Sequence, residues 1–159
     1  MRNIVVMLIS LVIFGCTGKA QENTRFPVQK SEAQWKEILS PGEFAVLRKK
    51  GTEPAFSSRL NDIDSPGTFV CAGCQNPLYR TKHKFDSGTG WPSFDRPVSQ
   101  KNVTYRPDPE VGYQAREVLC ARCGGHLGHV FNDGPRETTG KRHCINGLVL
   151  EFIPEMAED

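Results

Sequence analysis

Four of the six cysteines stand in two C-x-x-C pairs, Cys71 with Cys74 and Cys120 with Cys123, and this spacing limits the possible folds most strongly. Each pair follows a segment with β-strand character. A tight turn that carries two thiolates is a zinc knuckle, and two knuckles supply the four sulfurs that zinc prefers in closed structural sites. The separation between the pairs is longer than in small zinc fingers, so the fold of the domain must bring them together.

Two other uses of these cysteine pairs compete with a metal site. Exported chains meet oxidising surroundings in which two disulfides would form, and a metal-free C-x-x-C pair can act in redox chemistry. A redox pair normally lies at a helix N-terminus, which lowers the thiol pKa, whereas we expect strands and turns around both pairs. We therefore expect one zinc ion held by all four sulfurs, with a structural role because no coordination position is left open.

The pattern after residue 50 predicts one mainly β domain. The 159 residues suffice for a single hydrophobic core, and 11 prolines with 15 glycines indicate many turns. The predicted strands are 68–71, 78–80, 103–106, 116–120 and 148–153. In the last of these, Leu148, Leu150 and Phe152 should point inward, with Val149 and Glu151 on the other face.

Two short helices are predicted before the strands. Ser31 and Gln34 fit a capping box, which indicates that a helix starts there. Ser40, followed by Pro41 and Glu43, repeats the signal for a second helix. The domain should therefore carry a small helical N-terminal part.

The N-terminus is typical of a targeting segment. Arg2 precedes an apolar run at residues 4–15 that is too short to span a bilayer, and the run ends at Cys16 in a sequence similar to a bacterial lipobox. Lipidation of Cys16 is expected, with an ordinary cleaved signal and an incidental cysteine as the alternative. The expected division of the chain is 1–15 as signal peptide, 16–30 as flexible tether and 31–159 as functional domain.

These features predict an exported protein that is anchored by lipid in the bacterial cell envelope and faces the periplasm. The membrane would be contacted through the anchor only. The net charge of +2 is spread along the chain, which argues against a nucleic-acid partner. We expect a monomer.

The one cysteine outside these sets, Cys144, is a candidate nucleophile. Its neighbours Arg142 and His143 bring positive charge, which lowers a thiol pKa and favours the reactive thiolate. On this local pattern alone, an inert half-buried cysteine is equally consistent. His126 and His129 stand three residues apart, and histidine can deliver a proton to a leaving oxygen.

Further motifs support a catalytic site. Asp133 follows the histidine pair, and Trp91 stands in a glycine-rich loop where its ring face would suit a sulfur-bound methyl group. Together with the two cysteine pairs, the segments 51–56, 84–94, 126–131, 133–135 and 142–146 resemble the B-type methionine sulfoxide reductases, in the family's order.

The resemblance implies two antiparallel sheets, a structural zinc on the four paired cysteines, and reduction of the R epimer of methionine sulfoxide in oxidised peptides and proteins. Cys144 matches the family's catalytic cysteine and Trp91 its aromatic wall. The matching polar site residues are His126, His129, Asp133, Arg142 and Asn146. On this reading the Cys144 thiolate attacks the sulfoxide sulfur while His129, with His126, supplies the proton, which leaves Cys144 as a sulfenic acid. Asp133 would orient a histidine or a water, and Asn146 would bond near the sulfur.

The chain departs from the family where many members carry a resolving cysteine, because Thr89 stands at that position. Gly147 and Asn132 are two further departures. With four cysteines assigned to zinc and Cys16 to lipid, Cys144 is left as the only redox thiol, so we expect an external, thioredoxin-like thiol to reduce it. A non-enzymatic zinc module would leave Cys144 unexplained, and a thiol-disulfide oxidoreductase would need a C-x-x-C pair free of metal.

Overall fold

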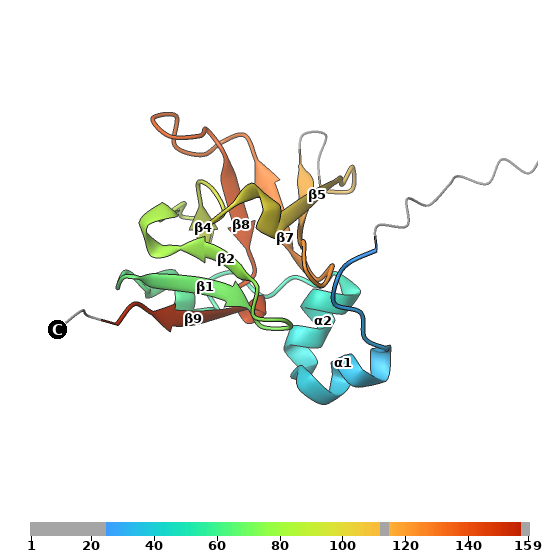
Figure 1. Cartoon of the computed structure of the whole chain (residues 1–159). Helices are drawn as coiled ribbons and strands as arrows, with labels where there is room; N and C mark the ends of the chain where they lie inside the picture. The colour runs from blue at the N-terminus through green and yellow to red at the C-terminus, as the bar shows by residue number, and fades with distance from the viewer. Residues whose placement is uncertain (1–24, 112–114, 157–159) are drawn as a thin grey trace, which may run out of the picture.

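The structure, a computed structural model, describes residues 25–111 and 115–156 (Figure 1). Its helices are α1 (Glu32–Ile38) and α2 (Pro41–Lys49). Its strands are β1 (Gly67–Cys71), β2 (Pro77–Arg80), β3 (Lys84–Phe85), β4 (Ser93–Phe94), β5 (Val103–Pro107), β6 (Arg116–Cys120), β7 (His126–Phe131), β8 (Arg142–Ile145) and β9 (Leu150–Pro154). Short 3-10 turns lie at Arg59–Asp62, Thr81–His83, Gln100–Asn102 and Gly147–Val149.

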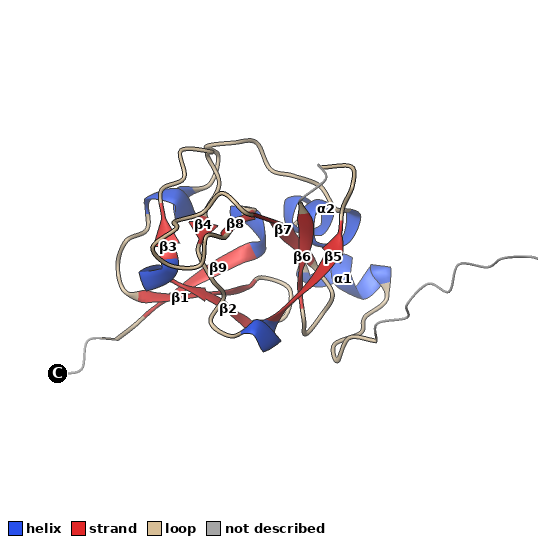
Figure 2. Cartoon of the chain, turned by 90° about the horizontal axis from the view of Figure 1, so that it is seen from above, coloured by secondary structure: helices blue, strands red, loops and turns tan. Residues whose placement is uncertain are grey.

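The strands form two antiparallel sheets, as the resemblance implies. One sheet has the order β2-β1-β9 and the other the order β3-β4-β8-β7-β6-β5. Figure 1 shows the first sheet below the second, and Figure 2 shows both helices on the side of β5 and β6, away from β3. The mainly β fold class is therefore confirmed, with a small helical part at the N-terminal side.

Both predicted helix starts are confirmed. Ser31 and Gln34 form the expected capping box, in which each side chain accepts a hydrogen bond from the other residue's backbone N–H. Ser40 and Glu43 form the same arrangement at the start of α2. Helix α2 packs against β7 and buries Phe44, Val46 and Leu47.

The last predicted strand is wrong at its start. The turn Gly147–Val149 replaces its first residues, and β9 begins only at Leu150. As a result Leu148 is 43% exposed and Val149 is fully buried, the reverse of the prediction. The cause is Glu53, whose carboxylate accepts hydrogen bonds from two backbone N–H groups of this turn and so ties it to a distant segment.

Strands β3, β4, β7 and β8 were not predicted. Cys144, for which no strand was predicted, consequently lies inside β8. The register pairs Cys144 with His129 and His143 with Val130. Because successive strand residues point to opposite faces, Cys144 and His129 share one face of the sheet, and His143 and Val130 share the other.

The hydrophobic core fills the space between the two sheets. The ring of Phe94 on β4 stacks on Tyr79 of β2 at 4.3 Å and meets Phe69 of β1 edge-on at 5.1 Å between centroids. Ile145, the residue after Cys144, is fully buried in the same cluster. The core thus holds β8 rigidly on both sides of the cysteine.

The signal peptide at residues 1–15, Cys16 and the first part of the expected tether lie outside the described residues. The described end of that tether lies against the domain, because Val28 donates its backbone N–H to the carbonyl of Arg122 at 2.8 Å and Phe26 covers Gly124. Packed structure therefore begins before Ser31. Within the described ranges, no helix is long and apolar enough to cross a membrane.

Candidate functional site

The four paired cysteines come together at the ends of β1 and β6. Their sulfur atoms all lie within 4.8 Å of one another, with 3.8 Å between Cys71 and Cys123 and 3.6 Å between Cys74 and Cys120. A tetrahedral zinc site with bonds of about 2.3 Å requires sulfur atoms about 3.8 Å apart. All five cysteines in the described ranges are free of disulfides. The cluster can therefore hold one metal ion.

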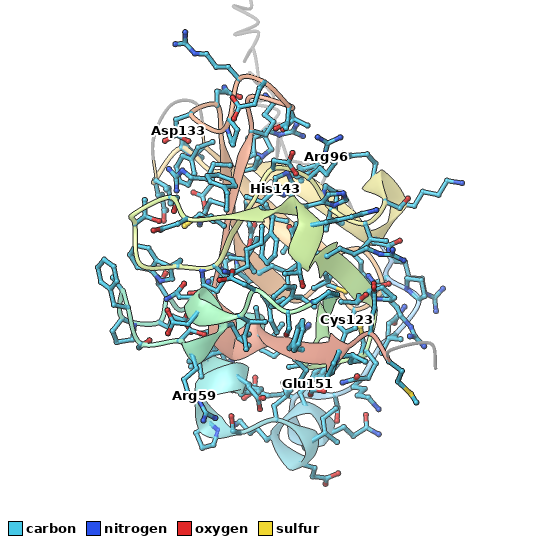
Figure 3. All side chains as sticks on the ribbon, turned by 90° about the vertical axis from the view of Figure 1, so that its left-hand side faces the viewer. Arg59, Arg96, Cys123, Asp133, His143 and Glu151 are labelled. Atoms are coloured by element: carbon cyan, nitrogen blue, oxygen red, sulfur yellow. The ribbon has the colours of Figure 1, made fainter. Side chains whose placement is uncertain are left out.

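This metal cluster is separate from the catalytic candidates. In Figure 3, Cys123 lies well below both His143 and Asp133, which mark the position of β8 and the loop before it. Burial of the thiols leaves little room for a substrate, because Cys71, Cys120 and Cys123 are each at most 3% exposed. The cluster is thus suited to a structural role.

Cys144 lines a small, mainly apolar pocket of about 200 Å³. The indole N–H of Trp91 donates a hydrogen bond to the carbonyl of Glu53 at 3.1 Å, which fixes the ring in the wall. The other lining residues are Thr52, Val111, Gly128, His129, Phe131 and Asn146. The pocket therefore brings together four of the residues predicted from the sequence, namely Cys144, Trp91, His129 and Asn146.

Burial raises the pKa of the Cys144 thiol above its ordinary value, although Arg142 and the hydroxyl of Thr89, 4.0 Å from the sulfur, act in the opposite direction. This net shift is the reverse of the sequence prediction. One reason is that His143 points to the other face of the sheet, where burial lowers its pKa to about 4 and keeps it neutral. Arg142 is thus the only one of the two neighbours that favours the thiolate.

Asp133 holds Arg142 in place. The guanidinium donates to both carboxylate oxygens of Asp133, at 3.0 and 2.8 Å, and lies 4.5 Å from the centre of the Phe131 ring. The sequence had assigned Asp133 to a histidine or a water, but its carboxylate is engaged by Arg142.

The two histidines of the predicted pair differ in their surroundings. His129 lies in the pocket, and its Nε2 is 3.0 Å from the carboxylate of Asp108. His126 is 3% exposed and does not line the pocket; its Nδ1 is 2.9 Å from the buried carboxylate of Glu117. Burial lowers the pKa of His126, so the ring is neutral with its proton on Nδ1, facing Glu117.

Asn146 and Glu53 fix the floor of the pocket. The Asn146 amide accepts a hydrogen bond from the backbone N–H of Glu53 at 3.0 Å and donates to the carbonyl of Leu127 at 3.0 Å. These bonds engage its oxygen and one amide hydrogen, so Asn146 joins three segments of backbone beside the cysteine. The sequence had instead assigned it a hydrogen bond near the sulfur.

The sequence reasoning missed Asp108, Glu117 and Glu53 as parts of the site. Asp108 lies on the loop after β5, and no local pattern marks it, because its partner His129 is distant in sequence. Glu117 is the second residue of β6. The sequence alone suggests that a single carboxylate on a strand faces solvent, so it was not recognised as a buried partner of His126. Glu53 lay inside the quoted segment 51–56, so the motif could have identified it.

A comparison with known protein families finds that the SelR domain matches residues 39–154. This range contains the four clustered cysteines and every residue of the pocket. The chain belongs to the SelR family. The match begins at Leu39, so α1 and the N-terminal segment lie outside the SelR domain.

Curated relatives are similar to this SelR protein over most of its length. Three of these relatives are each named peptide methionine sulfoxide reductase MsrB. They are 47% identical to this chain in Chromohalobacter salexigens, 48% in Leptospira interrogans and 51% in Bradyrhizobium diazoefficiens. The alignments cover 80%, 82% and 80% of this chain and 96%, 98% and 91% of the respective relatives. The aligned region thus extends over nearly the whole of each relative.

Gly128 of the SelR domain allows β7 and β8 to approach closely at the cysteine. Its φ is +153°, and a Cβ atom there would lie 2.1 Å from the carbonyl oxygen of Cys144. Gly128→Ala should therefore lower the free energy of unfolding by about 2–4 kcal/mol and displace Cys144. Denaturant unfolding measures the first effect and the rate of Cys144 alkylation the second. Gly140→Ala is the control, because Gly140 also has positive φ but a Cβ there meets no atom within 4 Å; equal costs for both variants would refute this explanation.

Proposed function

We infer that this chain is a peptide-methionine (R)-S-oxide reductase, an oxidoreductase that converts oxidised methionine in peptides and proteins back to methionine. The observation that carries this function is the Cys144 pocket, in which a thiol, the Trp91 face and His129 surround an apolar space of about 200 Å³ within a SelR domain. A methyl sulfoxide matches such a pocket, because its methyl group suits an aromatic wall and its oxygen needs a proton donor.

The proposed reaction transfers the sulfoxide oxygen to the enzyme. The Cys144 thiolate attacks the sulfoxide sulfur while His129 protonates the oxygen, since a sulfoxide oxygen leaves poorly without a proton. The S–O bond of the substrate breaks and the oxygen ends on Cys144 as a sulfenic acid. The methionine sulfur gains two electrons and the cysteine sulfur loses two, so the step balances without another reactant.

The environment of His129 supports its assignment as the proton donor. The hydrogen bond from His129 lowers the pKa of the Asp108 carboxyl, so an ionised carboxylate faces the ring and holds its orientation in the pocket. His126 does not line the pocket and so does not face a bound sulfoxide. We therefore assign proton delivery to His129, with His126 packing against it at 5.3 Å between ring centroids.

Asp108→Asn should lower kcat about 10- to 100-fold with little change in KM, because the amide no longer offers the carboxylate that orients the His129 ring. Steady-state kinetics will measure kcat and KM separately. Glu110→Gln removes a charge from the same loop without touching His129 and serves as the control. An unchanged kcat in Asp108→Asn would exclude this role.

Arg142→Gln should move the alkaline rise of activity to higher pH. Activity needs the thiolate, so it rises with pH through the thiol pKa, which burial already raises; removing Arg142 removes a charge that lowers this pKa. At neutral pH we expect kcat/KM to fall about tenfold, which corresponds to one pKa unit. Arg136→Gln, which removes an exposed arginine from the loop before β8, is the matched control. If activity falls at every pH and its rise with pH stays at the same pH, this assignment of Arg142 is contradicted.

The second half of the cycle is proposed to use an external thiol. Thr89 lies 4.0 Å from the Cys144 sulfur, where a resolving cysteine would be needed, and it has no thiol to offer. Two thiol groups of a thioredoxin-like partner would reduce the sulfenic acid, forming their own disulfide and releasing water. A Cys144 disulfide to another cysteine of the same chain, after one equivalent of sulfoxide, would refute this route.

Zinc is the ion we assign to the four-cysteine cluster, since four thiolates at tetrahedral spacing suit zinc and leave no position for a substrate. We further propose export, lipidation of Cys16, attachment to the periplasmic side of the cell envelope and a monomeric state. Mass spectrometry of the mature N-terminal peptide tests the lipid. An unmodified Cys16 in the mature chain would reject the anchor.

The decisive assay supplies the purified protein with each epimer of a methionine sulfoxide peptide and a small dithiol as reductant. We expect consumption of the R epimer alone, with a sulfenic acid on Cys144 trapped when the reductant is omitted. Consumption of the S epimer, or no consumption of either, would overturn the proposed function.

A further inference from the structure

The face of the six-stranded sheet that is turned away from Cys144 carries a second pocket of about 320 Å³, which the proposed reaction does not use. Strand alternation places His143 and Val130 on this face. Arg116 of β6 pairs with Val130, so it lies on the same face. Figure 3 shows His143 and Arg96 near one another, and both line this pocket. The lining residues that matter below are Asp95, Arg96, Tyr105, Arg116, Lys141 and His143.

His143 offers this pocket a buried hydrogen-bond donor. The residue is 3% exposed, and its Nδ1 lies 3.1 Å from the hydroxyl of Tyr79. Tyr79 is fully buried, and within the described ranges its hydroxyl contacts no other polar partner, so it must donate to Nδ1. Since burial keeps the ring neutral, its single proton is then on Nε2.

That Nε2–H group has no hydrogen-bond acceptor among the residues that the structure describes. Among the described residues, His83 Nδ1 is the only fully buried side-chain nitrogen or oxygen without a partner, so His143 Nε2 is not sealed inside the protein. Tyr79 is not part of the pocket lining, whereas His143 is. The Nε2–H group can therefore donate to a molecule that binds in the pocket.

The charges around this donor are mainly positive. The Arg116 guanidinium stacks over the Tyr105 ring at 5.0 Å, and Tyr105 in turn meets His143 with 5.8 Å between ring centroids. No carboxylate in the described ranges pairs with Arg116. Lys141 contributes an ammonium group that contacts the side chain of Asn132. The pocket thus holds two cations that no carboxylate neutralises.

Asp95 is the one carboxylate of the lining, and it is already neutralised. Arg96 donates to it through Nε and Nη2, at 3.2 and 2.8 Å. The remaining charge of the lining is therefore positive, and a cationic ligand would be repelled. A planar guanidinium also matches the geometry of an oxyanion, to which it can donate two parallel hydrogen bonds.

We propose that this pocket binds a small oxyanion, a carboxylate or phosphate group, with His143 Nε2–H as the uncharged donor and Arg116 and Lys141 as the cationic partners. The oxyanion would accept a hydrogen bond from Nε2–H and supply negative charge next to the two cations. This site lies behind the catalytic strand and is independent of methionine sulfoxide reduction.

Binding is tested by titrating the metal-loaded protein with inorganic phosphate and, separately, with acetate, at constant ionic strength. The signals to follow are the His143 side-chain N–H and the backbone amides of β6 and β8 in nitrogen-15 NMR spectra. We expect saturable changes centred on His143 and Arg116. Saturation by phosphate alone would identify a phosphate group as the ligand, and saturation by both would extend the site to carboxylates.

Arg116→Gln should weaken this binding about tenfold or more, because it removes a charge-assisted hydrogen-bond donor. Arg116 is exposed, so this variant should fold normally. Arg59→Gln is the matched control, since Arg59 is an exposed arginine outside the pocket. His143→Phe should abolish binding, and its thermal transition reports separately on folding. No saturable change with either anion, or equal affinity in Arg116→Gln and the unaltered protein, would overturn the proposal whether or not the chain proves to be a reductase.

Discussion

Cys144→Ser should abolish reduction of methionine sulfoxide, with a fall of about 10⁴-fold or more, while the protein keeps its metal. A serine hydroxyl is not ionised near neutral pH and is a far weaker nucleophile toward sulfur than a thiolate. The substitution is nearly isosteric, so the Trp91 wall and the His129–Asp108 pair should remain in place. Loss of activity would then reflect lost chemistry and not a lost pocket.

The measurement combines turnover of an R-sulfoxide peptide with metal analysis and a thermal transition. Retained turnover would exclude Cys144 as the nucleophile. Lost turnover together with lost metal would show that the variant is damaged more widely than the structure predicts, since Cys144 is not part of the four-cysteine cluster.

Cys120→Ser should have the largest effect on stability. Cys120 is fully buried at the end of β6, and its sulfur lies 3.6 Å from that of Cys74. Serine is a poor zinc ligand, so the variant should lose the ion and leave the three other thiols of the site, two of them buried, without a metal. Structural zinc contributes on the order of 10 kcal/mol in small domains, which is comparable to the whole stability of a domain of this size.

We therefore expect Cys120→Ser to bind less than one ion per chain and to lose its cooperative thermal transition. Cys144→Ser is the matched control, because it is the same chemical change outside the cluster and should retain one ion. A Cys120→Ser protein with full metal content and an unchanged transition would show that the cluster does not hold a structural ion.

Short sequence patterns correctly predicted the helix starts, which are stabilised by contacts between residues close in the chain. The capping boxes at Ser31 and Ser40 depend on contacts three residues apart, so the sequence was sufficient to find both helix starts. Strand alternation failed at Leu148 and Val149, where Glu53 imposes a turn through hydrogen bonds to Gly147 and Leu148, 94 and 95 residues away. No periodicity within the strand could report such a distant constraint.

For the same reason, only some residues of the site could be predicted from the sequence. Cys144, Trp91 and His129 stand in specific motifs, and the structure gathers them in one pocket. Asp108 carries no motif of its own and acquires its position only when β5, β6 and β7 pair side by side. The predicted fall in the Cys144 pKa was wrong because a neighbour in sequence need not be a neighbour in space, as His143 on the opposite face demonstrates.

The four cysteines of the two C-x-x-C pairs depend both on local spacing and on tertiary packing. Spacing within each C-x-x-C pair determined, by itself, that each turn can present two sulfurs to one ion, because a tight turn brings residues three apart together. Only the tertiary structure decided that the two turns meet, since β1 and β6 belong to different sheets that pack across one core. The same packing decided which face of β8 lines the Cys144 pocket, because the pleat sends Cys144 and His143 in opposite directions and the surrounding strands give each face different neighbours.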